Sequence, residues 1–307
     1  MPEDPENAAP ARAGPAVRPP GDPLYAAICR RVLEARGFDL APYAVGYIMR
    51  RINVRLGALG KTRDDLAGYL DILSRDHEEL THLISSISIN VTAFFRDPSL
   101  WAYLRAKLLP DLLRRKFLAA RMDTPNPSGR KVSVLRIWSA ACASGEEPYS
   151  IAMTLSDILG PGLEAAPPGF HLAIVASDID ERALAAGRAG IYPASAIEGV
   201  GPAWREKYFT LCDDGQFQVK PQLRSMVIFQ RHDFLQDEPF KAVDLVFFRN
   251  AGIYLDNERR KPLLGKFHSA LVPGGYLVLG MTELILGAQG TKAYTEFSVD
   301  EHVYRKV

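Results

Sequence analysis

The segment Trp138-Ser-Ala-Ala-Cys-Ala-Ser-Gly-Glu-Glu-Pro-Tyr-Ser150 decides the fold of this chain. The apolar run before it, Val132–Ile137, is typical of a buried strand, and the apolar-periodic run after it, Ile151–Leu159, predicts a helix. Small residues lie between the two elements: Ser139, Ala140, Ala141, Ala143, Ser144 and Gly145. Such a turn lets the backbone approach a ligand closely at the N-terminus of a helix.

Two carboxylates, Glu146 and Glu147, follow these small residues. A phosphate-binding loop avoids negative charge at this position, because it attracts an anion to the helix N-terminus. The pair therefore favours a ligand that is neutral or cationic and rich in hydroxyl or amine groups. S-adenosylmethionine has these properties, since it carries a ribose, an amino acid tail and a sulfonium.

Composition limits the class of protein. The 307 residues suffice for one large domain or two modest ones, and the 47% of apolar residues allows a substantial core. A net charge of +1 gives no overall attraction to nucleic acid or to an anionic membrane. Three distant cysteines, Cys29, Cys142 and Cys212, favour reduced thiols in a cytosolic protein. No apolar run approaches the roughly 20 residues of a membrane helix, and residues 1–23 predict a disordered tail without signal-peptide features.

The pattern changes along the chain and predicts several domains. Residues 24–90 predict a helical N-terminal domain, with a capping box at Thr62 and Asp65. Its expected helices are Leu24–Ala35, Tyr43–Leu56, Leu66–Leu73 and His77–Ile87. Residues 91–130 predict a linker with a bridging helix, Ser99–Phe117.

From residue 131 to 307, β-type runs alternate with helical segments, which predicts an α/β fold with a mostly parallel sheet. The expected strands are Val132–Ile137, Leu172–Ser177, Met226–Gln230, Val243–Phe248 and Tyr276–Leu279, with an antiparallel strand at His302–Arg305. The expected helices are Pro148–Leu159, Glu181–Ala189 and Asn257–Leu271. Short apolar runs around Asp214-Gly215 predict a small antiparallel insert at about residues 207–231.

Polar residues at strand ends and in the linker are the candidates for chemistry. Asp178 ends the second strand, where an acid accepts hydrogen bonds from ribose hydroxyls, although Asp180 beside it suits a helix N-cap. Arg249, Asn250 and Tyr254 follow the apolar strand that ends at Phe248, on the side where ligands bind in open α/β sheets. In the linker, three polar residues stand among apolar neighbours: Asn90, Thr92 and Arg96.

Two further patterns lie in the helical region. His77 and His82 are five residues apart and so about 140° apart on a helix, which argues against a zinc site; we expect no metal in this protein. Arg50, Arg51 and Arg55 share an arc of about 140° on the predicted Tyr43–Leu56 helix. They form either a solvated face or a docking surface for an acidic protein partner.

Together these motifs resemble the CheR-type chemoreceptor glutamate O-methyltransferases. The main matching segments are Asn90–Arg96, Trp138–Ser150, Ala176–Asp180 and Phe248–Asn250 with Ile253 and Tyr254. Further matches are Gly190–Tyr192, Tyr208-Phe209, His232-Asp233, and Pro273–Leu277 with Glu283. The likeness extends from residue 24 to the end of the chain. It implies an all-α N-terminal domain and a Rossmann-like class I methyltransferase domain that carries a small β-subdomain.

The resemblance also implies site residues and a reaction. Matching positions give cofactor contacts at Asn90, Thr92, Arg96, Ala140, Glu147, Asp178, Asp233, Phe234, Asn250 and Ala251. Glu147 and Asp178 are expected to hold the amino acid and ribose ends of S-adenosylmethionine, in either order. Arg96, Arg249 and Tyr254 match residues near the transferred methyl group, and the product is S-adenosylhomocysteine. The expected substrates are glutamates in the cytoplasmic helical domain of methyl-accepting chemoreceptors.

Two departures from the family pattern stand out. Ala251 and Gly252 replace bulky apolar residues after Arg249-Asn250, and we expect Gly252 to loosen the start of the next helix. The loop between Phe209 and Gln218 is short and contains one glycine, Gly215, which predicts an enzyme that does not depend on a receptor tether peptide.

Three functions remain open from the sequence: a chemoreceptor glutamate methyltransferase, a methyltransferase for a different substrate, and a cofactor-binding signalling or scaffold protein. For the first, we expect a cytoplasmic monomer recruited to receptor arrays, with no nucleic acid partner and no membrane insertion.

Overall fold

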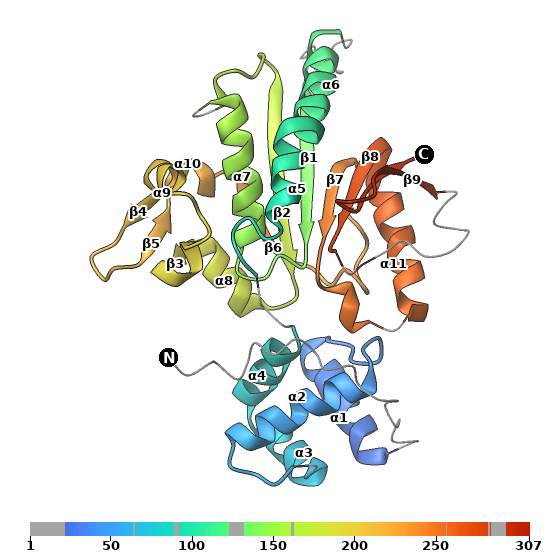
Figure 1. Cartoon of the computed structure of the whole chain (residues 1–307). Helices are drawn as coiled ribbons and strands as arrows, with labels where there is room; N and C mark the ends of the chain where they lie inside the picture. The colour runs from blue at the N-terminus through green and yellow to red at the C-terminus, as the bar shows by residue number, and fades with distance from the viewer. Residues whose placement is uncertain are drawn as a thin grey trace. The chain divides into compact units, whose positions relative to one another are not determined.

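The computed structural model describes residues 22–307 apart from 64, 89–91, 123–131, 161–162, 256, 282 and 284–292. The predicted tail therefore lies outside the described residues except for its last two positions, and residues 123–130 of the predicted linker lie outside them too. The chain divides into two compact units, residues 1–87 with 254–256 and residues 88–253 with 257–307 (Figure 1). None of the helices described is long and apolar enough to cross a membrane.

The first unit is helical and contains α1 (Pro23–Arg36), α2 (Val45–Ala58), α3 (Leu66–Arg75) and α4 (His77–Ile87). Gly37 ends α1 in the left-handed conformation that glycine adopts at little cost (φ 66°). The expected capping box differs in detail, because Asp65 itself is the N-cap of α3 and accepts the Gly68 N–H at 2.9 Å. Asp caps a helix as well as Thr does, and Asp65 directly precedes the first helical residue.

In the second unit, a long helical segment that starts at Pro98 replaces the single helix expected at Ser99–Phe117. It consists of α5 (Pro98–Tyr103), a π-helical segment (Leu104–Leu108) and α6 (Leu109–Met122). Pro110 is the second residue after the π-helical segment and lacks the N–H that a regular α-helix uses.

Among the described residues, the main sheet has seven strands in the order β6-β2-β1-β7-β8-β10-β9. The strands are β1 (Ser133–Ala140), β2 (Phe170–Asp178), β6 (Val227–Arg231), β7 (Val243–Phe248), β8 (Leu271–Leu279), β9 (Tyr294–Ser298) and β10 (Val303–Lys306). The neighbouring strands among β6, β2, β1, β7 and β8 pair in parallel, whereas β10 is antiparallel to both β8 and β9. Helices α6, α7 (Glu146–Leu159), α8 (Glu181–Ala189) and α11 (Asn257–Ala270) pack against this sheet. The predicted α/β fold with a final antiparallel strand is confirmed.

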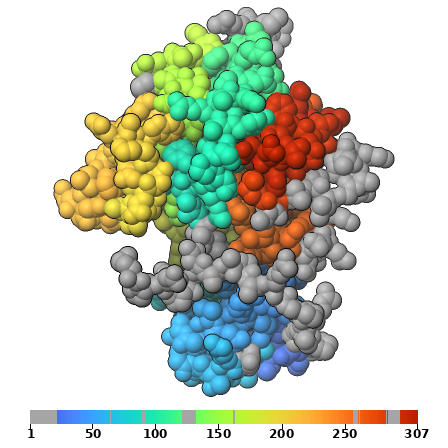
Figure 2. Space-filling model, in the orientation of Figure 1, coloured from blue at the N-terminus to red at the C-terminus, as the bar shows by residue number. Residues whose placement is uncertain are grey.

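A second sheet forms the insert, in the antiparallel order β3-β5-β4. Its strands are β3 (Ile191–Tyr192), β4 (Phe209–Leu211) and β5 (Phe217–Val219). The insert also contains a 3-10 helix (Ala194–Ile197), α9 (Pro202–Tyr208) and α10 (Pro221–Arg224). In Figure 2 the insert is the yellow and orange lobe beside the blue-green helices α5 and α6.

The expected insert bounds of 207–231 need two corrections. The antiparallel sheet starts at Ile191, and the last stretch, Val227–Arg231, is β6 of the main sheet, paired in parallel with β2. Leu223, which lies in the range predicted for the antiparallel insert, belongs to a short helix, because Pro221 favours the first position of a helix.

Candidate functional site

The small-residue turn after β1 has a strained backbone. Ala141 (φ 59°), Ala143 (φ 47°) and Gly145 (φ 97°) are all left-handed, and the non-glycine residues occupy this region at a cost of about 1–2 kcal/mol each. A Cβ atom on Gly145 would lie 2.9 Å from the Phe229 ring, so only glycine fits there. Strain of this kind persists where the surroundings hold it, and it is common at ligand sites.

Asp178, at the end of β2, holds this turn in place. Its carboxylate accepts the Ala143 N–H and the Asp180 N–H, each at 2.9 Å. Burial raises the pKa of Asp178 to about 6. Both oxygens keep lone pairs for a ligand hydroxyl, since a carboxylate accepts about four hydrogen bonds. Asp180 is the N-cap of α8, accepting the N–H groups of Arg182 and Ala183, as its position suggested.

The two glutamates at the start of α7 have different surroundings. Glu146 is buried and accepts the Ser144 hydroxyl at 2.8 Å, and this burial raises the pKa of its carboxyl group. Glu147 accepts the Ser139 hydroxyl at 2.7 Å and pairs with Arg249 Nη1 at 3.1 Å. Ala140, the small residue before the turn, is buried. Of the two glutamates, Glu147 is thus the one that forms an ion pair, with Arg249.

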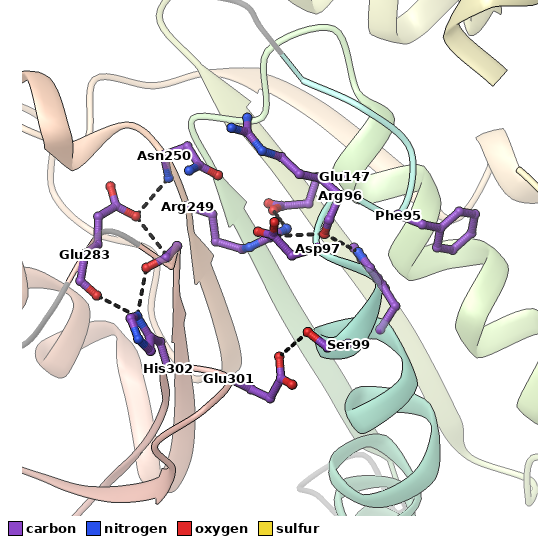
Figure 3. Close-up of polar contacts among 12 residues, drawn as sticks. Phe95, Arg96, Asp97, Ser99, Glu147, Arg249, Asn250, Glu283, Glu301 and His302 are labelled. Atoms are coloured by element: carbon purple, nitrogen blue, oxygen red, sulfur yellow. Dashed lines mark hydrogen bonds and ion pairs between the residues drawn. The ribbon is translucent and has the colours of Figure 1, made fainter. Parts of the chain in front are cut away.

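Arg249 joins three segments through one buried guanidinium group (Figure 3). Besides Glu147, Nη2 donates to Asp97 Oδ2 at 2.6 Å and to the Arg96 carbonyl at 2.9 Å. Nε is buried and has no hydrogen-bond partner within the described part of the chain. The residue predicted to lie near the methyl group therefore ties the linker to the start of α7.

The linker segment is anchored through its backbone. Phe95 and Asp97 are both left-handed, and the Phe95 N–H donates to the Ser150 hydroxyl at 3.0 Å. The Arg96 carbonyl also accepts the indole N–H of Trp101 at 2.9 Å. The Arg96 side chain extends away from the Arg249 guanidinium in Figure 3. Thr92 is half-buried, and Asn90 lies outside the described residues.

A buried acid, Glu283, organises the loop after β7. It accepts the N–H groups of Asn250 (2.8 Å), Gly280 (2.9 Å) and Gly252 (2.7 Å). Asn250 is left-handed, and Ala251 beside it is half-buried. Gly252 is thus held by a hydrogen bond to Glu283, and the loosening of the next helix start stays a prediction. Sequence reasoning reached Glu283 only through the resemblance, although an acid just beyond the end of β8 was a usable signal.

Residues after β6 complete this edge of the sheet. Asp233 is buried, which raises its pKa, and it caps the following turn by accepting the N–H groups of Leu235 and Gln236. The Phe234 ring lies 5.2 Å from that of Phe248 at the end of β7. Glu147, Asp178 and Asp233 thus follow three neighbouring parallel strands, β1, β2 and β6, at the edge where ligands of such sheets bind.

Four of the predicted residues belong to the helical unit. Tyr254 stacks on Tyr47, with ring centroids 4.9 Å apart. Arg55 forms a two-point ion pair with buried Glu79, at 2.9 and 2.6 Å, and is therefore part of the unit's internal packing. Arg51 lies over the Tyr47 ring, 5.3 Å from its centroid, whereas Arg50 is exposed.

The residues at the sheet edge fit S-adenosylmethionine. Carboxylates of Glu147, Asp178 and Asp233 are acceptors for amine and hydroxyl groups, and the unpartnered Nε–H of Arg249 is a donor for a carboxylate. The turn of small residues leaves its backbone open to close approach. These acceptors and this donor match the amino acid tail and the ribose of the cofactor.

Comparisons with known proteins agree with this geometry. The model described as CheR methyltransferase, SAM binding domain, matches residues 90–300, and that described as CheR methyltransferase, all-alpha domain, matches residues 23–88. A chemotaxis protein methyltransferase of Borreliella burgdorferi is 36% identical over 242 residues, covering 77% of this chain and 80% of that protein. One from Listeria monocytogenes is 34% identical over 263 residues, with 85% and 90% covered.

A third relative is larger. An uncharacterized 104.1 kDa protein of Rhodobacter capsulatus is 34% identical over 247 residues, which is 80% of this chain and 24% of that protein. Both domains of one family match in order, and together they cover nearly all of the chain from residue 23 to residue 300. The chain therefore belongs to the CheR methyltransferase family and is an S-adenosylmethionine-dependent methyltransferase.

Proposed function

We propose that this methyltransferase transfers the methyl group to glutamate side-chain carboxylates of chemoreceptors, forming glutamyl methyl esters in chemotaxis adaptation. The observation that carries the proposal is the Arg249 junction. Through Asp97 and the Arg96 carbonyl, it fixes the linker residue Arg96 next to Glu147, one of the carboxylates at the sheet edge. A guanidinium side chain beside a cofactor pocket suits a carboxylate substrate, which it binds through two parallel hydrogen bonds.

The reaction asks little acid–base work of the protein. A glutamate carboxyl group has a pKa of about 4.3, so the substrate is already ionised at neutral pH. S-adenosylmethionine, when bound, supplies a methyl group activated by the sulfonium. The chain's residues then have to align the two partners and exclude water from them. In this proposal Arg96 orients the substrate carboxylate, Tyr254 fixes the geometry beside the methyl group, and Arg249 holds Arg96 in position.

The cofactor contacts are part of the same proposal. Glu147 and Asp178 would accept hydrogen bonds from the amine and ribose groups, and Asp233 and Phe234 would contact the remainder, with Asn250 and Ala251 from the loop after β7. Buried surroundings favour such contacts, because a hydrogen bond made away from water is electrostatically stronger.

A hollow on α2 is the proposed docking surface for the receptor. It has a volume of about 510 Å³ and is lined by Gly46, Met49, Arg50, Asn53, Val54, Gly57 and Arg63. Exposed Val54 and half-buried Met49 offer apolar contact, and Arg50 and Arg63 offer positive charge. Both suit a receptor helix that carries glutamates. Arg50 thus keeps its proposed docking role, whereas Arg55 and Arg51 have partners within the helical unit.

The remaining features of the proposal concern the setting of the reaction. The enzyme would act as a cytoplasmic monomer on the cytoplasmic helical domain of receptors, recruited to their arrays. The hairpin between β4 and β5 is tight, with the Cys212 N–H bonded to the Gln216 carbonyl at 2.8 Å. We therefore propose that receptors are methylated without a C-terminal tether peptide. Measurable binding of such a peptide would contradict this part.

Calorimetry followed by methyl transfer tests the function. We expect S-adenosylmethionine to bind, and labelled methyl groups to pass to receptor-containing membranes as a base-labile product, as an ester is. Cofactor binding without transfer to any substrate would favour a signalling or scaffold protein. Transfer to a base-stable product, or only to other substrates, would favour a different methyltransferase.

A further inference from the structure

Tyr254 is held by the helical unit and not by the sheet that precedes it in the chain. The Ala44 N–H donates to the Tyr254 carbonyl at 3.4 Å, and Leu255 forms an antiparallel bridge with Tyr43. Ile253 and Asn257, on either side of this segment, belong to the second unit. The start of α2 therefore determines where the backbone of Tyr254 lies.

The Tyr47 ring is the platform under the Tyr254 ring. The two rings are nearly parallel, with an interplanar angle of 26° and centroids 4.9 Å apart. The Tyr47 hydroxyl donates to the carbonyl of Ile87, the last residue of α4. A carbonyl at the end of a helix has no hydrogen-bond partner within that helix. Arg51 and Tyr43 lie near the same ring, at 5.3 and 6.4 Å. Tyr47 is thus fixed at both its ring and its hydroxyl group.

We infer that Tyr47 is a positioning residue for methyl transfer, and that it acts by holding the ring of Tyr254. The inference rests on the proposed function, in which Tyr254 fixes the geometry beside the transferred methyl group. Both rings belong to the helical unit, so a movement of α2 moves the platform of Tyr254.

Magnitudes separate this role from simple packing. An aromatic pair contributes only about 0.5–1.5 kcal/mol beyond the area that it buries. Misplacing a reacting group by about 1 Å costs on the order of 100-fold in rate. Removing the Tyr47 ring should therefore reduce the rate of methyl transfer by more than its effect on stability predicts. A residue that only packs would lower stability and leave the rate of the folded enzyme unchanged.

Three variants of the full chain test the inference. Tyr47→Leu removes the platform, and we expect kcat to fall about tenfold or more while the Kd for S-adenosylmethionine stays the same. Tyr47→Phe keeps the ring and should restore most of kcat. The matched control is Tyr69→Phe, which removes a buried tyrosine hydrogen bond to Glu79 in the same unit, at 2.7 Å. It should lower the melting temperature with no change in kcat.

A double-mutant cycle shows whether Tyr47 acts through Tyr254. In a Tyr254→Ala background, Tyr47→Leu should have almost no further effect on kcat, because residues that act as a unit are not additive. Additive effects, or a wild-type kcat in Tyr47→Leu, would overturn the inference.

Amide hydrogen exchange tests the positioning role of Tyr47 without relying on methyl transfer to receptors. If the wild-type protein transfers no methyl group to receptors, the proposed function fails, and kcat cannot be used. Tyr47→Leu should still speed exchange of the Ala44 amide, since its hydrogen bond to the Tyr254 carbonyl loses its support. Unchanged exchange of that amide would count against the positioning role by itself.

Discussion

Arg249 Nη1 lies 3.1 Å from Glu147 Oε2, so an arginine after β7 neutralises a glutamate at the start of α7. The Arg249 side chain is only 3% exposed, and the same guanidinium holds Asp97 of the linker. Through Arg249, the linker is therefore connected to the edge of the sheet by ion pairs with Asp97 and Glu147.

Replacing Arg249 should therefore disturb both stability and activity. Arg249→Gln leaves Glu147 and Asp97 without their cation, and we expect a loss of about 3–5 kcal/mol in the free energy of unfolding. Arg249→Lys keeps the charge but lacks the planar fork that reaches three oxygens, so it should recover only part of this loss. Urea unfolding curves measure both. Equal stability of the lysine variant and the wild type would show that charge alone matters.

Asp178 predicts how stability depends on pH. Burial raises its pKa to about 6, whereas an unfolded aspartate has a pKa of about 3.9. Between these values the folded state keeps a proton that the unfolded chain has lost. The free energy of unfolding should therefore fall as the pH rises through this window, by at most about 3 kcal/mol from this residue.

The variant Asp178→Asn isolates this effect. We expect it to be less stable overall, because an amide cannot accept from both the Ala143 and Asp180 N–H groups as the carboxylate does. Its stability should nevertheless decline less than that of the wild type between pH 4 and pH 7. Parallel pH profiles of the two proteins would contradict the assignment.

Gly252 should tolerate no side chain. A Cβ atom there would lie 3.0 Å from Glu283 Oε1 and 3.0 Å from the Phe248 ring. We expect Gly252→Ala to cost about 1–3 kcal/mol and to weaken cofactor binding, since Glu283 also holds Asn250. The control is Gly201→Ala, where a Cβ atom would meet nothing within 4 Å. Thermal unfolding and calorimetry of the two variants decide the point, and equal behaviour would refute it.

Two arginines of α2 should have different roles, Arg50 in receptor docking and Arg55 in the stability of the helical unit. Arg50→Glu places a negative charge in the docking hollow, and we expect the KM for receptors to rise about tenfold, with cofactor affinity and melting temperature unchanged. Arg55→Leu leaves Glu79 buried without its cation and should destabilise the helical unit by about 3 kcal/mol or more. If Arg50→Glu methylates receptors normally, the hollow is not the docking surface.

Tyr254 should not serve as a general base, because the substrate carboxylate is already ionised. We expect Tyr254→Phe to keep its ring stack on Tyr47 and to retain turnover within about tenfold of the wild type. Turnover profiles between pH 6 and pH 10 measure this. Loss of turnover confined to pH values below 9, with normal cofactor affinity, would restore a base role for the hydroxyl group.

Local patterns in the sequence were sufficient for most elements of the fold. The period of apolar residues located α4, α8 and β7 at the residues where the structure has them, since that period alone marks the buried face of an element. The β6 strand was harder to place. The sequence put Met226–Gln230 among the strands of the main sheet and also within the insert at 207–231, and only its pairing with β2 assigns it to the main sheet.

The sequence by itself determined the α/β fold, the small-residue turn after Trp138 and the types of residue at the strand ends, because each depends on neighbours along the chain. Only the tertiary structure decided the partners of those residues. Arg249 meets Glu147 across 102 positions, and Arg55 is drawn into an ion pair with Glu79. Tyr254 lies with the helical unit, on Tyr47. Such contacts depend on how distant segments pack, and no local period encodes them.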